Sequence, residues 1–377
     1  MKLRFSWLIL ALLTWAHSLY AQVNQNPQKH VLYSHILDEY RSIQVSIPPA
    51  YNKLEKSYPV LYILDGEWIF DYARGCVDYL GNEELGKIPH MLVVGIENTN
   101  RKRDLSVTFK ADAPYHHFLD FVEFELKSFI EKNYRVNGFD LIYGWSSASA
   151  ICSQFLATRP EVFDAYIESG SDLEWQREHF LKTHLSKNTY KHTSHYVSTE
   201  SKSSIRMEGV RRYALLMDAL KPQGLRSRFE VLTDHTHLDV LSQGLAAGLR
   251  FTFEPYLMPD STMLKGKSAI LAYLDRIDPL YKFPVEIPEG ILHSAVNLLC
   301  KHGKNSEAIQ ILLYGMDVHT LSPYIPAKLA ALYENLGERD KALTFYLLAR
   351  HKAEGNSILF QKYNALYESL LADTLQN

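Results

Sequence analysis

Residues 141–157 constrain the fold of this chain more than any other stretch. The apolar run at 141–143 predicts a strand, and residues 150–157 predict a helix with one buried apolar face. Between them lies Gly144-Trp145-Ser146-Ser147-Ala148, with a serine between small residues. A serine on a tight strand-to-helix turn is typical of a nucleophile elbow, because small neighbours let the helix pack close to the strand. The pattern Gly-x-Ser-x-Ala is short, so an ordinary strand–helix turn is the alternative.

Apolar segments alternate with amphipathic segments on both sides of this turn. Residues 58–64 and 91–96 are nearly continuous apolar runs, as expected for strands that are covered on both faces. The alternation predicts an α/β fold with a doubly wound, mostly parallel sheet, in which ligand sites lie beyond the carboxyl ends of the strands. The other expected strands are 34–37, 41–47, 165–170, 196–199 and 228–232, and the main expected helices are 70–79, 118–134, 207–220 and 241–253.

Two histidines after the last expected strand are candidates for the base that Ser146 needs. A serine hydroxyl becomes a strong nucleophile when a neighbouring base accepts its proton. His237 lies deeper than His235 in the loop before the next helix, so we expect His237 to be the base. The alternatives are His235, or two surface histidines without a catalytic role.

Glu200 is the candidate for the acid that orients the histidine. The chain order expected for this type of site is serine, then acid, then histidine, and Glu200 directly follows the strand at 196–199. Glu208 is the alternative, whereas Asp234 and Asp239 would break that order. Glu200 could instead be a solvated loop carboxylate.

An oxyanion hole requires two convergent backbone N–H groups, each typically worth about 3 kcal/mol of transition-state stabilisation. We expect one from Ser147, directly after the nucleophile, and the other from Gly66 or Glu67, after an earlier strand. Gly66 could instead only close a turn.

In the charged loop that begins at residue 98, Arg103 and Asp104 can form an ion pair.

Composition excludes several classes of function. The formal net charge of −3 gives no reason to expect nucleic acid or an anionic membrane as partner. The three cysteines have no CxxC spacing, which argues against a disulfide scaffold and a thiolate metal site. The polar stretch at 175–193 is expected to cap the site. The histidines within it and just after it lack metal-ligand spacing, so we expect no cofactor and no metal. The cysteines are Cys76, Cys152 and Cys300, and the histidines are His179, His184, His192 and His195.

The first 21 residues have the pattern of a secretory signal peptide. Lys2 and Arg4 precede an apolar run at 5–13 that is too short for a comfortable membrane span, and Leu19-Tyr20-Ala21 offers a cleavage site after Ala21. We expect a periplasmic or secreted protein with no membrane span after processing. An uncleaved anchor is the alternative.

The pattern changes from alternating elements to helices alone in the last third of the chain. We expect an α/β domain at 22–257, a proline-containing linker at 258–288 and a helical domain at 289–377. A period of 34 residues predicts tetratricopeptide-like helix pairs, which could serve in homodimerisation, protein-partner binding or structural support. The repeating positions are Gly303, Ala308, Leu312 and Gly315, followed by Gly337, Ala342, Tyr346 and Ala349.

The chain resembles the bacterial putative-esterase family of the α/β-hydrolase superfamily, which includes esterase D-like and enterobactin-esterase-like enzymes. The resemblance spans about residues 34–256 and is carried by segments 46–51, 58–66, 98–105 and 143–149 and the loop at 236–237. The family usually has Gly-His-Ser-x-Gly-Gly at its elbow. Trp145, Ala148 and Ser149 depart from that pattern, and Leu238 stands where glycine is common.

The resemblance implies an α/β-hydrolase fold and a serine hydrolase that cleaves a carboxylic ester of a small molecule through an acyl-enzyme. Ser146, His237 and Glu200 would form the triad. Siderophores, acylated sugars and simple acyl esters remain open as substrates, as do thioesters and amides. The alternative is a catalytically weak or inactive hydrolase-fold adaptor that binds partners through its helical repeats.

Overall fold

The computed structural model describes residues 27–375 except positions 83–84, 109, 111, 172, 174 and 203. The expected signal peptide at 1–21 lies outside the described residues. The chain divides into two compact units. One contains the residues up to Asp78 together with His90–Thr252, and the other contains Tyr79–Pro89 and Phe253–Asn377.

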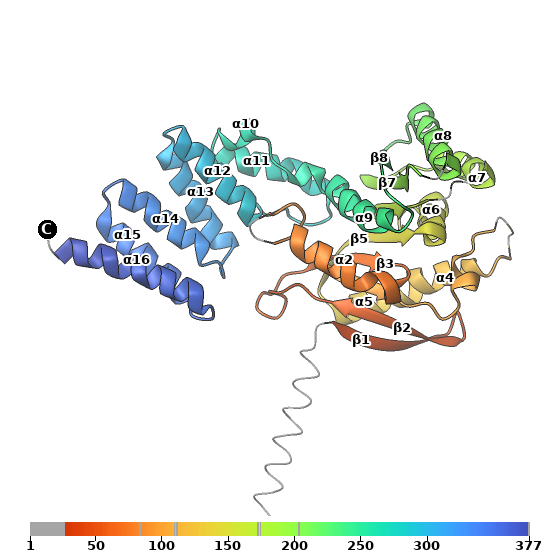
Figure 1. Cartoon of the computed structure of the whole chain (residues 1–377), viewed down its shortest axis with the longest axis horizontal. Coiled ribbons are helices and arrows are strands. Elements are labelled where there is room, and N and C mark those ends of the chain that lie inside the picture. The colour runs from red at the N-terminus through yellow and green to blue at the C-terminus, as the bar shows by residue number, and fades with distance from the viewer. Residues whose placement is uncertain are drawn as a thin grey trace, which may run out of the picture. The chain divides into compact units, whose positions relative to one another are not determined.

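Eight strands of the described chain form one sheet in the first unit (Figure 1). The strand order is β1-β2-β4-β3-β5-β6-β7-β8. The β1–β2 and β2–β4 pairs are antiparallel, and all other pairs are parallel. The expected mostly parallel α/β fold is therefore confirmed. The strands are β1 (Gln28–Ser34), β2 (Glu39–Ser46), β3 (Tyr58–Ile63), β4 (Leu92–Ile96), β5 (Val136–Trp145), β6 (Ala165–Ser169), β7 (Thr193–Glu200) and β8 (Leu225–Leu232).

The first strand lies earlier than the sequence suggested, and the expected strand at 34–37 is wrong. Residues 35–38 form the turn between β1 and β2. The backbone N–H groups of His35 and Ile36 donate to the carboxylate of Glu125 at 2.8 and 3.2 Å, and Asp38 has a φ of +52°. These interactions hold the chain in a turn, although the residues are apolar enough for a strand.

Helices cover both faces of the sheet (Figure 1). One face packs against a continuous helical run made of α4 (Tyr115–Asp120), the π-helix η1 (Phe121–Leu126) and α5 (Lys127–Asn133), and against α6, α7 and α8. The run matches the long helix expected at 118–134. The other helices on this face are α6 (Ser149–Thr158), α7 (Trp175–Leu185) and α8 (Ser204–Leu220).

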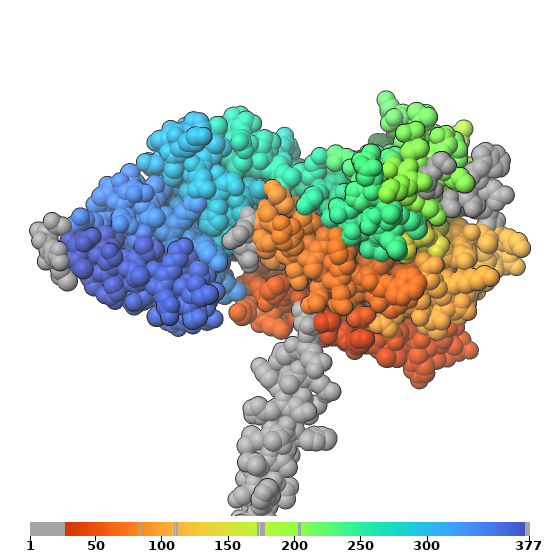
Figure 2. Space-filling view, in the orientation of Figure 1, coloured from red at the N-terminus to blue at the C-terminus, as the bar shows by residue number. Residues whose placement is uncertain are grey.

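The opposite face is covered by α2 (Gly66–Leu80) and α9 (Asp239–Thr252). A Cβ on Gly95 of β4 would lie 2.7 Å from Phe70 of α2, and one on Gly248 of α9 would lie 2.4 Å from Ile167 of β6, so both helices approach the sheet closely. The Tyr72 hydroxyl of α2 donates to the backbone oxygen of Ser242 of α9 at 2.7 Å. Figure 2 shows these helices in contact, orange against green.

A buried ion-pair cluster fixes the charged loop that follows β4. Arg41 is fully buried and donates to the Asp104 carboxylate at 2.6 Å, and Arg103 of α3 (Arg101–Leu105) donates to the same carboxylate at 2.6 Å. Glu39 accepts from both arginines at 2.7 to 2.9 Å. The expected Arg103–Asp104 ion pair is confirmed.

The second unit is helical. It contains η3 (Glu254–Tyr256), α10 (Asp260–Met263), α11 (Lys267–Ile277) and η4 (Asp278–Leu280), followed by longer antiparallel helices. Gly303 and Gly337, 34 residues apart, occupy equivalent turns with φ of +72° and +77°. Assignment of these helices to the tetratricopeptide family remains a prediction. The longer helices are α12 (Glu289–Lys301), α13 (Asn305–Val318), α14 (Tyr324–Asn335), α15 (Arg339–Lys352) and α16 (Ser357–Leu375).

Candidate active site

Ser146 lies at the apex of a strained strand-to-helix turn. Strand β5 ends at Trp145, the 3₁₀ turn η2 (Ser146–Ala148) follows, and α6 begins at Ser149. Ser146 has a φ of +57°, a conformation that costs a residue with a side chain about 1–2 kcal/mol. A Cβ on Gly144 would lie 2.6 Å from the carbonyl oxygen of Ala148, so only glycine fits there. These features are those of a nucleophile elbow.

His237 faces the Ser146 hydroxyl. Its Nε2 lies 2.9 Å from Ser146 Oγ, within hydrogen-bond distance. His237 belongs to the loop between β8 and α9, beyond the carboxyl end of the strand. His235, the alternative base, instead has its Nδ1 2.6 Å from the carbonyl oxygen of Thr233. The structure therefore brings His237 to the serine.

Glu200 is the last residue of β7 and faces the other nitrogen of His237. Its Oε1 lies 3.2 Å from His237 Nδ1, and Arg206 donates to the same oxygen at 2.7 Å. The 3.2 Å contact is not aligned as a hydrogen bond, because Nδ1 has no aligned hydrogen-bond partner. Catalytic hydrogen bonds are often poorly aligned until substrate binds. Glu208, the alternative acid, is exposed and lies 3.8 Å from Arg212.

The environment of Glu200 favours the charged carboxylate. Burial acts to raise its pKa, but hydrogen bonds from its own backbone N–H and from Arg206, together with the neighbouring His237 imidazole, outweigh burial. The pKa of Glu200 therefore lies below its ordinary value. A carboxylate that is ionised near neutral pH can stabilise a positive charge on the imidazole beside it.

Trp145 and Gly170 fix the position of His237. The indole Nε1 of Trp145 donates to the backbone oxygen of His237 at 2.9 Å, and the two ring centroids lie 4.9 Å apart. A Cβ on Gly170, which has a φ of +58°, would lie 2.7 Å from Cε1 of His237. Sequence reasoning missed both roles. The replacement of the family's usual histidine by Trp145 was the available signal.

The segment after β3 holds the second candidate donor group for an oxyanion. Asp65 has a φ of +56°, and α2 begins at Gly66, where a Cβ would lie 2.6 Å from the backbone of Gly95. Arg101 donates two hydrogen bonds to the Asp65 carboxylate at 2.7 and 2.8 Å. The Glu67 carboxylate accepts from the Asn98 side chain at 2.7 Å. These contacts fix the backbone around Gly66 and Glu67.

A buried polar chain behind the elbow was also missed. The Ser149 hydroxyl donates to the backbone oxygen of Ser146 at 2.6 Å and lies 3.1 Å from Ser171 Oγ. Ser171 donates to the fully buried carboxylate of Glu168 at 2.8 Å, and His195 Nε2 lies 3.1 Å from that carboxylate. The signal was an acid inside the apolar strand β6. This series of buried polar contacts supports the turn that carries Ser146.

A metal-binding group of side chains and a membrane-spanning helix can be looked for only among the described residues. Within them, no group of three or more histidine, cysteine, aspartate or glutamate side chains could hold a metal ion. Among the helices that the structure describes, none has the length and apolar character to cross a membrane.

Residues 34–207 match the family model described as putative esterase. This segment of the chain matches the esterase family. The match covers Ser146, directly after β5, and Glu200 at the end of β7, and it supports an ester hydrolase.

The esterase has further relatives in sequence and in fold. It is 26% identical over 249 residues to ferri-bacillibactin esterase BesA of Bacillus subtilis, a match that covers 55% of this chain and 81% of the relative. An IroE-like serine hydrolase from Shewanella oneidensis shares the fold with a TM-score of 0.67 and 24% identity, over 78% of this chain and all of the other. Siderophore hydrolase EstB from Aspergillus nidulans has a TM-score of 0.52 and 18% identity, over 62% of this chain and 96% of the other.

Proposed function

We propose that this esterase is a serine hydrolase in which Ser146 is the nucleophile, His237 the general base and Glu200 the acid that orients the histidine. The observation that carries the proposal is the 2.9 Å contact between Ser146 Oγ and His237 Nε2 at a turn with positive φ. A strained elbow presents the hydroxyl to substrate, and a histidine in contact can remove its proton.

Acylation follows from this geometry. Ser146 Oγ attacks the ester carbonyl carbon while His237 Nε2 accepts the hydroxyl proton, which gives a tetrahedral oxyanion and an imidazolium. The Glu200 carboxylate stabilises that imidazolium from the Nδ1 side. The oxyanion accepts hydrogen bonds from the backbone N–H of Ser147 and from that of Gly66 or Glu67. Collapse breaks the bond to the alcohol, which leaves with the proton from His237.

Deacylation repeats these steps with water as the nucleophile. His237, again neutral, removes a proton from a water molecule that attacks the acyl carbon. The second tetrahedral oxyanion collapses and expels Ser146 Oγ, which regains its proton from His237. The products are a carboxylic acid and the free enzyme.

The substrate class that we propose is a siderophore ester. The similarity to a ferri-bacillibactin esterase over 81% of that protein supports it. The site surroundings are compatible with a bulky ester, because Trp68 on α2 is 64% exposed and Leu238, directly after His237, is 71% exposed. Exposed apolar side chains beside a catalytic group offer contact area to a large ligand.

We also propose that the protein acts in the periplasm or outside the cell, as the N-terminal signal pattern indicates. Mass spectrometry of the protein recovered from an expressing bacterium tests this. Processing after Ala21 is expected, and an intact N-terminus in the cytoplasmic fraction would contradict it.

The proposed chemistry is tested by hydrolysis of p-nitrophenyl butyrate. Ser146→Ala and His237→Ala are expected to lower kcat by on the order of 10⁴–10⁶, as seen when members of a cooperating triad are removed. Ser186→Ala, which changes an exposed serine after α7, and His235→Ala are the matched controls. Hydrolysis by Ser146→Ala at the wild-type rate would contradict the assignment of Ser146 as the nucleophile, whereas the absence of hydrolysis by the wild-type protein would favour the adaptor hypothesis.

The substrate class is tested separately with ferri-bacillibactin. A kcat/KM at least about tenfold above that for p-nitrophenyl butyrate is expected, since substrate contacts beyond the reacting ester add transition-state binding. Equal or lower values would point to a simple ester as the substrate while leaving the triad assignment intact.

A further inference from the structure

Arg206 contacts the acid of the proposed triad, and the proposed ester chemistry gives this arginine no part. It is the third residue of α8, and its Nη1 donates a 2.7 Å hydrogen bond to Oε1 of Glu200. The same oxygen lies 3.2 Å from Nδ1 of His237. A guanidinium stays protonated throughout the pH range in which enzymes are assayed. One oxygen of the triad acid is therefore shared between a permanent cation and the general base.

Groups other than His237 orient the Glu200 carboxylate. Its second oxygen, Oε2, accepts from Thr199 Oγ1 at 3.3 Å. Nδ1 of His237, by contrast, is buried without an aligned hydrogen-bond partner, although Oε1 of Glu200 is within reach. A hydrogen bond between two charged groups is roughly twice as strong as one between neutral groups. The contact with Arg206 therefore decides where the carboxylate points.

Helix α8 holds Arg206 in this position. A Cβ on Gly209, three residues further along α8, would lie 2.8 Å from the carbonyl oxygen of Leu173, so this turn packs directly against the segment after β6. Arg212 of α8 donates to Glu178 of α7 at 3.1 Å. The Arg206 side chain is 29% exposed, whereas the carboxylate side chain that it contacts is 2% exposed. The cation therefore reaches a buried acid from a helix that is itself held in place.

The charge of Arg206 also acts on the base. A carboxylate alone stabilises an imidazolium beside it, whereas a carboxylate paired with a guanidinium forms a group with no net charge. The Arg206–Glu200 pair therefore stabilises protonated His237 less than Glu200 alone would. A histidine that stays neutral to lower pH can accept the proton of the serine in a more acidic medium.

The other groups around His237 do not reproduce this effect. The contacts from β5, the elbow and the end of β6 come from uncharged residues, and Asp239 at the start of α9 accepts two hydrogen bonds from Thr236 at 2.6 and 2.8 Å. Among the described residues, Arg206 is the one permanent cation in contact with Glu200. The uncharged residues are Trp145, Ser146 and Gly170, and the other titratable groups in and near the loop are Lys202, Asp234 and His235.

We propose that Arg206 is a positioning residue of the esterase, which orients the Glu200 carboxylate and offsets its charge so that His237 remains a neutral proton acceptor in mildly acidic medium. The inference rests on the proposed triad of Ser146, His237 and Glu200. It adds a fourth side chain, which acts on turnover through Glu200.

The test is the pH dependence of kcat/KM with p-nitrophenyl butyrate, with the released p-nitrophenol quantified by chromatography. Arg206→Gln is expected to move the midpoint of the acid limb up by at least about half a pH unit, the order of effect of one nearby charge. Its kcat on the plateau should fall about threefold to tenfold with little change in KM, because the carboxylate loses its strongest donor.

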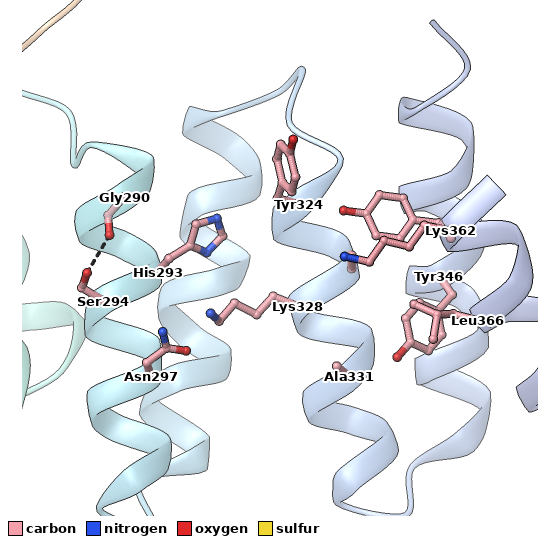
Figure 3. A pocket seen from close by; sticks show the side chains of 12 residues that line it. Gly290, His293, Ser294, Asn297, Tyr324, Lys328, Ala331, Tyr346, Lys362 and Leu366 are labelled. Atoms are coloured by element: carbon pink, nitrogen blue, oxygen red, sulfur yellow. Dashed lines mark hydrogen bonds between the residues drawn. The ribbon is translucent and has the colours of Figure 1, made fainter. Parts of the chain in front are cut away.

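Three further variants separate charge from structure. Arg206→Lys keeps the cation but not the planar fork of donors, so it should keep the wild-type midpoint while its kcat remains lowered. Arg211→Gln removes an exposed arginine from the same helix. Lys362→Gln removes a cation from the helical unit, where Lys362 lines a pocket of about 520 Å³ and reaches from α16 toward α14 (Figure 3). The last two variants change the net charge as much as Arg206→Gln does and should leave both the midpoint and kcat unchanged.

A double-mutant cycle tests whether Arg206 acts through Glu200. In the Glu200→Gln background the charge that Arg206 orients is gone, so Arg206→Gln should lower kcat by less than about twofold there. Equal losses of kcat in the two backgrounds would overturn the positioning role.

The pH profile can also overturn the proposal. An acid midpoint of Arg206→Gln equal to that of the wild type would do so whether or not kcat falls, and so would a midpoint that moves equally in Arg206→Lys. Circular dichroism verifies folding; if Arg206→Gln does not fold, a shifted midpoint or a wild-type kcat in Arg206→Lys would contradict the proposal. Full activity of Glu200→Gln would instead contradict the triad itself.

Discussion

The indole Nε1 of Trp145 donates a 2.9 Å hydrogen bond to the backbone oxygen of His237, and the two rings lie 4.9 Å apart. The residue before the nucleophile thereby fixes the loop that carries the base. The family that the chain resembles usually has histidine at this position. The departure replaces one ring with a larger one that also holds the catalytic loop.

Replacing this tryptophan should affect turnover more than binding. Trp145→Phe keeps a ring beside His237 but loses the N–H donor, so kcat is expected to fall about threefold to tenfold with little change in KM, since one neutral hydrogen bond contributes about 0.5–1.5 kcal/mol. Trp145→Leu loses both interactions and should fall further. Steady-state kinetics of both variants check this, and equal kcat values for wild type and both variants would contradict it.

Glu200 should contribute through its charge. Glu200→Gln keeps the size of the side chain but removes the charge that faces His237 Nδ1, so kcat is expected to fall by about 10²–10⁴. Glu208→Gln, an exposed position on the next helix, is the matched control and should retain wild-type kcat. If Glu208→Gln loses activity and Glu200→Gln does not, the acid has been assigned to the wrong residue.

Gly170 should be required for the position of His237. A Cβ at this residue would lie 2.7 Å from the imidazole, so Gly170→Ala is expected to displace His237 and lower kcat by at least about tenfold. Gly138→Ala is the control, because Gly138 has a φ of +82° and no atom within 4 Å of the added Cβ. Both variants carry a backbone cost of about 1 kcal/mol in urea unfolding. Only Gly170→Ala should lose activity, and a similar kcat in both would count against the positioning role.

Glu39 should make stability depend on pH in acid. Hydrogen bonds from Arg103 and Arg41 outweigh burial and lower its pKa from 4.5 to about 2. Because the folded-state pKa is the lower one, the stabilisation is fully present above about pH 4.5 and is lost as the pH falls toward 2. Urea unfolding of wild type and Glu39→Gln should therefore differ most near neutral pH and converge in acid. A difference that is constant with pH would contradict this origin.

The sheet was predictable because its strands are nearly continuous apolar runs separated by amphipathic helices. The first strand was not, because the apolar segment 35–37 is held in a turn by Glu125, which is about 90 residues away in sequence. A pattern along the chain contains no information about a tertiary contact of that kind.

The residues of the candidate site could be predicted where their order along the chain and their positions after strands were enough to identify them. Ser146, His237 and Glu200 come together at the carboxyl ends of β5, β8 and β7, as their order along the chain indicated. The contacts of Trp145 and Gly170 with His237 depend on ring orientation and on spacing below 3 Å, which no sequence pattern encodes.

Covalent labelling tests the central claim most directly. After incubation with a fluorophosphonate probe, intact-mass spectrometry should find a single adduct on the wild-type protein, and peptide mapping should place it on Ser146. The Ser146→Ala variant should remain unlabelled, while His235→Ala should label like the wild type. A label that persists in Ser146→Ala, or ester hydrolysis by a wild-type protein that the probe neither labels nor inhibits, would contradict the assignment of Ser146 as the nucleophile.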